Sequence, residues 1–184
     1  MADAAPKTFE FTLILRGLDF DRQDDRDRLF EAGCDDAVLG IRSGWAFAAF
    51  DREATDYAEA LLSAAADVQR AGAEVYAIEP DSYVTQADIS SRSGLTRQAI
   101  SQYVSGKRGK HFPLPARNIS TGSTLWLWPD VAAFLFRQGA VEPDCPQQAC
   151  LNWVASERLN DLPKLAPTEL LAAATLRPQW VLDS

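Results

Sequence analysis

This chain of 184 residues has few of the residue types on which most catalytic and metal sites depend. It contains a single histidine, His111, and three cysteines. So few cysteines indicate no disulfide framework, and they favour a reduced, cytoplasmic location. Cys145 and Cys150 lack the second pair of ligands that a zinc site needs, and Cys34 is expected to be a small buried residue.

Several sequence signals are also missing. No apolar run reaches the roughly 18 residues of a membrane span, so we expect no membrane partner. The first ten residues carry one lysine and no apolar stretch, unlike a secretory signal. The phosphate-binding motifs GxxxxGK[ST] and GxGxxG are absent. The acidic residues from Asp19 to Asp27 either hold a cation or form a solvated face, and we prefer the solvated face. We therefore predict no catalytic residue, no cofactor and no metal, and a protein that is not an enzyme.

The net charge of −8 argues at first against nucleic acid, but it is unevenly distributed. Residues 1–80 hold 8 Lys and Arg against 17 Asp and Glu, which gives −9. Residues 81–140 hold 7 against 3, which gives +4, and residues 141–184 hold 3 against 6, which gives −3. A basic middle between acidic ends indicates that only the middle segment meets phosphate.

The first 80 residues show six alternating elements. Strands are predicted at 8–19, 37–41, 45–50 and 73–78 from their apolar alternation, with Arg42-Ser43-Gly44 as the hairpin turn. Helices are predicted at 23–33 and 55–71, and Gly72 ends the second one. The order β-α-β-β-α-β resembles the ferredoxin-like arrangement. Trp45, Phe47 and Phe50 on the hairpin either pair with a second copy or cover the domain's own helices.

Residues 83–109 predict two short helices joined by a tight turn. Thr85 can cap the first helix, with Asp88 in the capping-box position, and Thr96 can cap the second. Gly94 falls where the turn needs a positive φ, and Gly106 ends the second helix. Apolar residues follow at helical spacing on the inner face, namely Ile89, Leu95, Ala99, Ile100, Tyr103 and Val104.

The outer face of the second helix is polar. Arg97, Gln98, Ser101 and Gln102 are residue types that read base edges in a major groove. Lys107, Arg108 and Lys110 follow at once, where they would lie close to phosphates. This segment resembles the helix-turn-helix of bacterial and phage regulators.

Residues 112–136 extend the resemblance. Residues 118–120 and 124–128 can form a small hairpin about Thr121-Gly122-Ser123, after which Pro129 and Asp130 begin a helix. Trp126, Trp128 and Phe112 are read as core rather than as stacking platforms. The run from 83 to 137 resembles the excisionase/MerR-like winged helix-turn-helix. The resemblance implies that 97–104 enters the major groove and that the wing near 117–123 contacts the backbone or minor groove. The DNA-binding residues it implies are Thr85, Gln86, Thr96, Arg97, Gln98, Ser101, Gln102, Lys107, Arg108, Lys110, Arg117 and Ser123.

The C-terminal segment predicts a helix at 147–159 and a second at 168–176, separated by Pro163 and Pro167. Helices this short need a surface on which to dock. A winged helix usually works as a dimer, so we expect the N-terminal domain or these helices to supply the contact.

The sequence thus predicts an α+β chain of three parts. These are a ferredoxin-like domain (1–80), a winged helix-turn-helix (81–138) and a helical C-terminal extension (139–184). The expected function is a dimeric, sequence-specific regulator that binds double-stranded DNA. Two alternatives stay open: an excisionase-like architectural protein, and an antitoxin or adaptor that binds a partner protein through its acidic domain or its C-terminal helices.

Overall fold

The structure, a computed structural model, describes residues 5–120 and 122–175 of the chain. These residues form two compact units. The sheet unit comprises the chain up to Pro80 together with Val154–Thr175, and the helical unit comprises Asp81–Trp153. Of the helices in these described ranges, none is long and apolar enough to cross a membrane.

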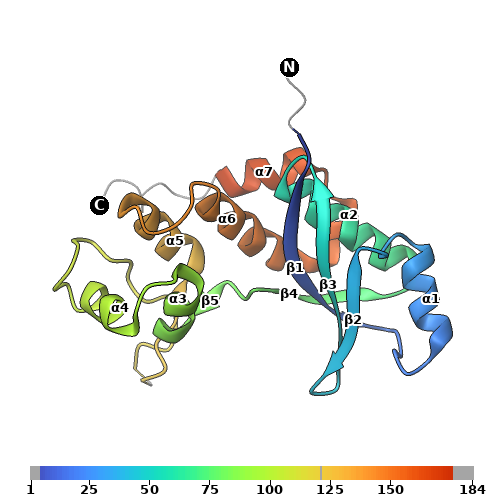
Figure 1. The fold of residues 1–184 in the computed structure, drawn as a ribbon, viewed down its shortest axis with the longest axis horizontal. Coiled ribbons are helices and arrows are strands. Elements are labelled where there is room, and N and C mark those ends of the chain that lie inside the picture. Colours follow the sequence, from blue (N-terminus) through green and yellow to red (C-terminus); the bar gives the residue numbers. More distant parts are fainter. Residues whose placement is uncertain (1–4, 121, 176–184) are drawn as a thin grey trace. The chain divides into compact units, whose positions relative to one another are not determined.

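The sheet unit contains the six elements in the expected order. They are β1 (Lys7–Arg16), α1 (Gln23–Glu31), β2 (Ala37–Arg42), β3 (Trp45–Ala54), α2 (Tyr57–Arg70) and β4 (Glu74–Glu79). The strands form one antiparallel sheet in the order β2-β3-β1-β4 (Figure 1). The chain is therefore of mixed α+β class, as predicted.

Alternation along β1 decides which face of this sheet is buried. Phe9, Phe11, Leu13 and Leu15 are all buried, and α2 packs on β1, β3 and β4. Phe50 of β3 is buried on the same face and stacks on Phe11. Phe50 therefore does not share a face with Trp45 and Phe47, which lie an odd number of residues away along the strand.

The C-terminal segment does not form a separate extension. The boundary between the units falls within α6 (Cys145–Ser156). Beyond it, η1 (Leu159–Lys164) and α7 (Pro167–Thr175) pack on α2. Leu162 and Leu170 are fully buried there, because helices of this length are stable only when their apolar faces are docked. The expected end of the second helix, Leu176, lies outside the described residues.

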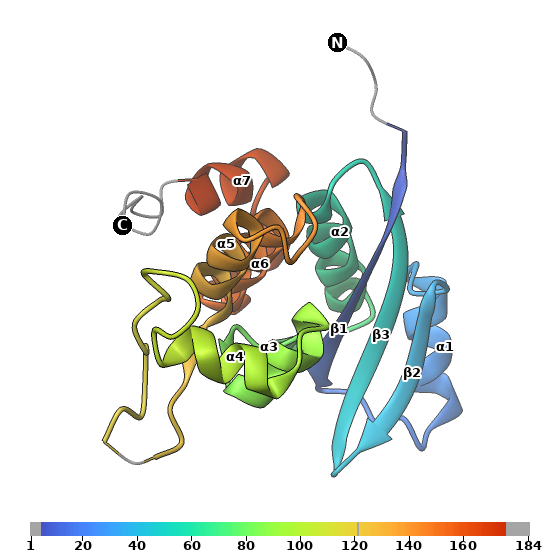
Figure 2. The same cartoon turned by 60° about the vertical axis from the view of Figure 1, so that its left-hand side comes forward.

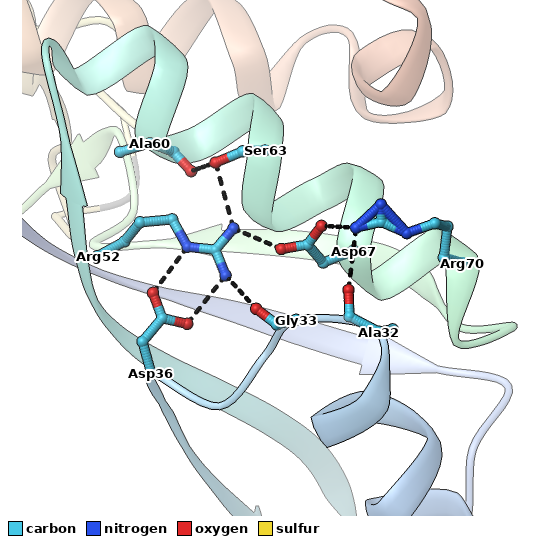
Figure 3. A network of polar contacts seen from close by, with 8 residues as sticks. All are labelled: Ala32, Gly33, Asp36, Arg52, Ala60, Ser63, Asp67 and Arg70. Carbon is cyan, nitrogen blue, oxygen red and sulfur yellow. Dashed lines mark hydrogen bonds and ion pairs between the residues drawn. The ribbon is translucent and has the colours of Figure 1, made fainter.

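A buried arginine ties β3, the loop between α1 and β2, and helix α2 together (Figure 3). The Arg52 guanidinium of β3 donates to both carboxylate oxygens of Asp36, at 2.8 and 2.9 Å, and to Asp67 of α2 at 2.7 Å. It also donates to the carbonyl of Gly33 and the hydroxyl of Ser63. Burial alone would lower the pKa of Arg52, but the hydrogen bonds to Asp36 and Asp67 outweigh burial and raise it. Asp67 also accepts from Arg70, so this network is structural and well satisfied.

The helical unit is built from short elements. They are β5 (Tyr83–Val84), α3 (Gln86–Ser93), α4 (Arg97–Val104), β6 (Trp126–Leu127), α5 (Trp128–Arg137) and the start of α6. Helix α3 contacts both α4 and α5 (Figure 2). Their shared core holds Val84, Ile89, Ile100, Tyr103, Trp126, Trp128, Val131, Phe134 and Leu135. Pro129 lies in the first turn of α5, as expected from its fixed φ.

The expected wing hairpin is reduced to one pair of residues. Arg117 and Leu125 form an isolated bridge, and residues 118–120 are not a strand. Asn118 has a φ of 55°, a left-handed conformation that interrupts an extended run. Strand β6 pairs instead with β5, where Val84 and Trp126 are both buried. Trp128 already belongs to α5, so it does not share a strand with Trp126. Thr121, in the expected turn, lies outside the described residues.

Candidate nucleic-acid interface

Local capping fixes the boundaries of α3 and α4 as the sequence predicts. The Thr85 hydroxyl accepts from the backbone N–H of Asp88 at 3.2 Å, and the Asp88 carboxylate accepts from the backbone N–H of Thr85 at 2.8 Å. Gly94 ends α3 with a φ of 68°, and Thr96 caps α4 through the backbone N–H of Ala99. The capping box, the left-handed turn and the second cap are therefore confirmed.

The inner face of α4 is held by apolar packing. Ile100 and Tyr103 are buried, and Leu95 and Val104 pack against the same core. The Tyr103 ring meets the Phe134 ring of α5 edge-on, with centroids 5.2 Å apart. Because these contacts fix the rotation of α4 about its axis, they also fix which side chains point outward.

The outward face of α4 carries three of the expected base-reading residues. Arg97, Gln98 and Ser101 are exposed, while Gln102 is half-buried at the edge of this face. None of these four side chains makes a hydrogen bond or ion pair with another residue in the described part of the chain. Their donors and acceptors are therefore available to an external ligand.

A basic loop follows α4 and is held close to it. Lys107, Arg108 and Lys110 are exposed, and none of them forms an ion pair within the described ranges. The backbone N–H of Arg108 donates to the carbonyl of Gln102 at 3.0 Å, and the guanidinium lies 5.0 Å from the centre of the Tyr103 ring. Gly109 has a φ of 66°, and a Cβ there would come within 3.1 Å of Tyr103 and Phe134. The loop is therefore pressed onto the aromatic core beneath α4.

The other expected contact residues are more dispersed. Arg117 stacks over the Tyr83 ring, with its guanidinium 3.7 Å from the ring centre, and Ser123 is exposed. Thr96 is exposed at the start of α4, beside Arg97. Thr85 and Gln86 are half-buried at the start of α3, and the Thr85 hydroxyl is already bonded to Asp88. The structure therefore gathers Thr96, Arg97, Gln98 and Ser101 on one helix face, and leaves Arg117 and Ser123 on a separate loop.

Sequence reasoning missed how the aromatic residues support this surface. The Phe112 ring lies 5.1 Å from Phe134 and 6.3 Å from Trp126, and Arg92 lies over the Trp128 ring at 5.3 Å. Burial lowers the pKa of Arg92 despite the opposing influence of Asp88 and Asp81. Trp126 and Trp128 are buried, so neither offers a ring face to a base. The sequence does carry a signal for this packing. Phe112 and Pro113 follow the cations closely, and an aromatic residue at this place indicates that the loop returns to the core.

Groups capable of other chemistry are placed elsewhere. His111 is exposed in the loop after Lys110. Burial raises the pKa of Cys34 to about 12, and it also raises the pKa of Cys145, so neither thiol is a ready nucleophile. Among the acidic residues of 19–27, Asp25 is buried and accepts from the Asp19 backbone N–H and from Arg28, so it is not part of a solvated face. In the described ranges no three His, Cys, Asp or Glu residues cluster in a way that could hold a metal ion.

Comparison with known proteins assigns the chain to no family. No family model matches it, and no curated protein and no solved structure is significantly similar to it. The function must therefore be argued from the residues and geometry of the chain itself.

Proposed function

We propose that this protein is a transcriptional regulator that binds specific sequences of double-stranded DNA, with α4 as its recognition helix. The observation that carries the proposal is the outward face of α4, where Arg97, Gln98 and Ser101 are exposed and their side chains make no hydrogen bond or ion pair with another described residue. Arginine and glutamine side chains with free donors and acceptors are the groups that discriminate base pairs in a major groove. Lys107, Arg108 and Lys110 supply the positive charge for the flanking phosphates.

The arrangement of the helical unit supports a winged helix-turn-helix. Helix α3 and α4 meet at a left-handed glycine, and both rest on a core shared with α5. In this proposal the loop between Arg117 and Leu125 is the wing, which the single bridge between these residues closes at its base. The guanidinium of Arg117 and the hydroxyl of Ser123 would then contact the phosphate backbone.

We further propose that the sheet unit has a ferredoxin-like fold and holds the protein as a homodimer. The element order and the strand order β2-β3-β1-β4 support this fold assignment. The net charge of −9 on residues 1–80 would keep this unit away from phosphate. We place the protein in the cytoplasm, where its three cysteines would stay reduced, and we assign it no catalytic role.

The test is binding of the full chain to duplex DNA from its own promoter and to random duplex DNA, across a series of salt concentrations. We expect a specific complex roughly a thousandfold or more tighter than the random background, whose affinity falls steeply with salt. Equal affinity for both duplexes would contradict sequence-specific regulation. Absence of binding at low salt would contradict the whole proposal and would reassign the α4 surface to a protein partner, as in an antitoxin or adaptor.

A second candidate is an architectural role, in which the protein bends DNA. Two apolar side chains in the loop after α4 favour it, because Leu114 is 82% exposed and Ile119 is 70% exposed. Leu114 stands between Pro113 and Pro115, which stiffen the backbone, and apolar side chains that wedge between base steps kink duplex DNA. Gel mobility of circularly permuted operator fragments would show a position-dependent shift for the wild type and a smaller one for Leu114→Ala. Position-independent mobility would rule this role out.

A further inference from the structure

The face of the sheet opposite to α2 contains a pocket of about 470 Å³ within the sheet unit. Antiparallel sheets commonly expose one face to water, and that face is then polar. Here the pocket wall includes Ile14 of β1, Phe47 and Trp45 of β3, and Tyr76 of β4. Its volume and its mostly apolar lining are those of small-molecule sites.

Tyr76 reaches this face through a break in the strand pairing. Ile14 is paired with Ala77, whereas Leu15 is paired with Val75, so Tyr76 is the extra residue of a β-bulge. Ile78 is buried on the helix-covered face, and regular alternation would point Tyr76 to that face too. Instead Tyr76 is 46% exposed, because bulges re-aim side chains, often beside functional sites.

The re-aimed Tyr76 ring meets Trp45 across the central strand. The two ring centroids are 4.3 Å apart with an interplanar angle of 22°, which is a stacked pair. Since β1 lies between β3 and β4 in the sheet, the pair forms an aromatic wall over β1 near Arg16. Arg16 supports the wall from outside the pocket lining, because it lies 5.7 Å from the Tyr76 ring centre and pairs with Glu74 at 2.8 Å.

Phe47 forms part of the pocket floor because its neighbour on β2 has no side chain. Gly40 is directly paired with Phe47, and a Cβ on Gly40 would lie 2.5 Å from the Phe47 ring. The ring therefore extends over Gly40. A larger residue at position 40 would displace it, so the apolar floor depends on this glycine.

The charges at the ends of the pocket suggest what it binds. Arg42 and Glu79 are exposed, lie on the two edge strands β2 and β4, and form no ion pair in the described part of the chain. Thr12, which also lines the pocket, is the register partner of Glu79 on β4. One end of the pocket therefore offers a free cation, and the other offers hydrogen-bond acceptors.

We propose that this pocket binds a small planar aromatic carboxylate. Its ring lies against Phe47 and the Trp45–Tyr76 wall, its carboxylate meets Arg42, and an amino or hydroxyl group at its far end donates to Glu79 or Thr12. The site belongs to the sheet unit alone and does not depend on the DNA-binding proposal.

Two fluorescent probes with closely similar rings test the proposal on the full chain. 1-Anilinonaphthalene-8-sulfonate carries an anionic group, and N-phenyl-1-naphthylamine has the same ring system without it. We expect Trp45→Ala to lower the affinity for both probes by about three- to tenfold, because the ring contact is lost. Arg42→Gln should lower the affinity for the anionic probe alone, also by about three- to tenfold, because a charge-assisted hydrogen bond is lost.

Two control variants separate this pocket from nonspecific probe binding to apolar surface. Leu114→Ala removes an exposed apolar side chain of the helical unit and should leave both affinities unchanged. Val38→Ala removes an exposed apolar side chain of β2 that does not line the pocket, and it should also bind both probes like the wild type. Circular dichroism checks the fold of each variant, and Arg42→Gln remains informative if Trp45→Ala unfolds, because Arg42 is exposed and unpaired among the described residues.

Three results would overturn the proposal. Unchanged probe affinity in folded Trp45→Ala would show that the probes do not bind in this pocket. Equal effects of Arg42→Gln on both probes would show that Arg42 does not recognise an anionic group. Sedimentation that shows a wild-type dimer dissociated by Trp45→Ala would assign this face to a second copy of the chain instead. Because the readout needs no DNA, failure here leaves the α4 proposal standing, and failure of DNA binding leaves this one standing.

Discussion

The two units use their cations in opposite ways. In the sheet unit, Arg16, Arg28, Arg52 and Arg70 each pair with a carboxylate. In the helical unit, Arg97, Lys107, Arg108 and Lys110 make no ion pair within the described residues. The four paired arginines of the sheet unit are thus part of its scaffold, whereas the four cations of the helical unit are available for binding, as is Arg42 of the pocket. The net charge of −8 for the whole chain conceals this difference.

The largest expected effect would come from removing the buried cation of the sheet unit. Arg52→Met leaves Asp67, which is buried, and Asp36 without their shared partner, and should cost about 3–5 kcal/mol of unfolding free energy. The matched variant Arg16→Met breaks an exposed pair and should cost about 0–1 kcal/mol. Urea denaturation followed by circular dichroism measures both. Equal losses would show that the Arg52 network does not stabilise the unit.

Truncating the free cations of the helical unit should change binding and leave stability nearly constant. Arg97→Ala should reduce the discrimination between operator and mutated operator by about 1–3 kcal/mol. Lys107→Ala should instead weaken all duplexes alike and lower the salt slope by about one. Fluorescence anisotropy titrations at several salt concentrations separate the two outcomes, with Arg42→Gln in the sheet unit as the control. An unchanged preference in Arg97→Ala would show that α4 does not read the bases.

In the helical unit, helix caps should contribute more to stability than ion pairs do. Thr85→Ala removes the hydroxyl that accepts from the Asp88 backbone N–H and donates to the Asp88 carboxylate, and should cost about 1 kcal/mol. Thr96→Ala removes a cap without a reciprocal partner, so the loss should be smaller. Thermal unfolding of the two variants side by side gives the comparison. A larger loss for Thr96→Ala would contradict the role of Asp88.

The smallest expected effect is on the stability of the protein at acidic pH. Hydrogen bonds from the Thr85 backbone N–H and then from its hydroxyl lower the pKa of Asp88 below its ordinary value of 3.8. The stability that Asp88 contributes is therefore present above its unfolded pKa and is lost as the pH falls through the folded one, below about pH 4. Asp88→Asn should flatten the decline of the melting temperature in this acid range. Glu142→Gln, at an exposed carboxylate without a hydrogen bond to described residues, should follow the wild type. Parallel curves of melting temperature against pH for the wild type and both variants would contradict the prediction.

Features encoded by neighbouring residues could be predicted from the sequence. Thr85, Gly94 and Thr96 marked the ends of α3 and α4 because each cap is a bond between a side chain and a nearby backbone group. The same reasoning found the turn at Ser43 and Gly44, both of which have positive φ. The outward face of α4 was also predicted, apart from the half-buried Gln102. DNA binding by that face remains a prediction.

Features that depend on distant partners were not predicted. The Arg52 network joins β3 to residues 11 to 19 positions away, and no local pattern specifies it. The bulge that turns Tyr76 outward depends on the register between β1 and β4. Strand β6 pairs with β5, more than forty residues earlier, because that pairing buries Val84 and Trp126. Periodicity along one segment carries no information about such partners.

The division of the sheet unit between two stretches of chain has a consequence for how the protein is made. A ribosome synthesises Asp81–Trp153 before the segment Val154–Thr175, whose helices cover α2. Domains commonly fold in the order in which they emerge. Here the described part of the helical unit is synthesised while the sheet unit still lacks its last helices. Released chains truncated after residue 153 should therefore hold a protease-resistant helical unit together with a sheet unit whose α2 remains open to chaperones.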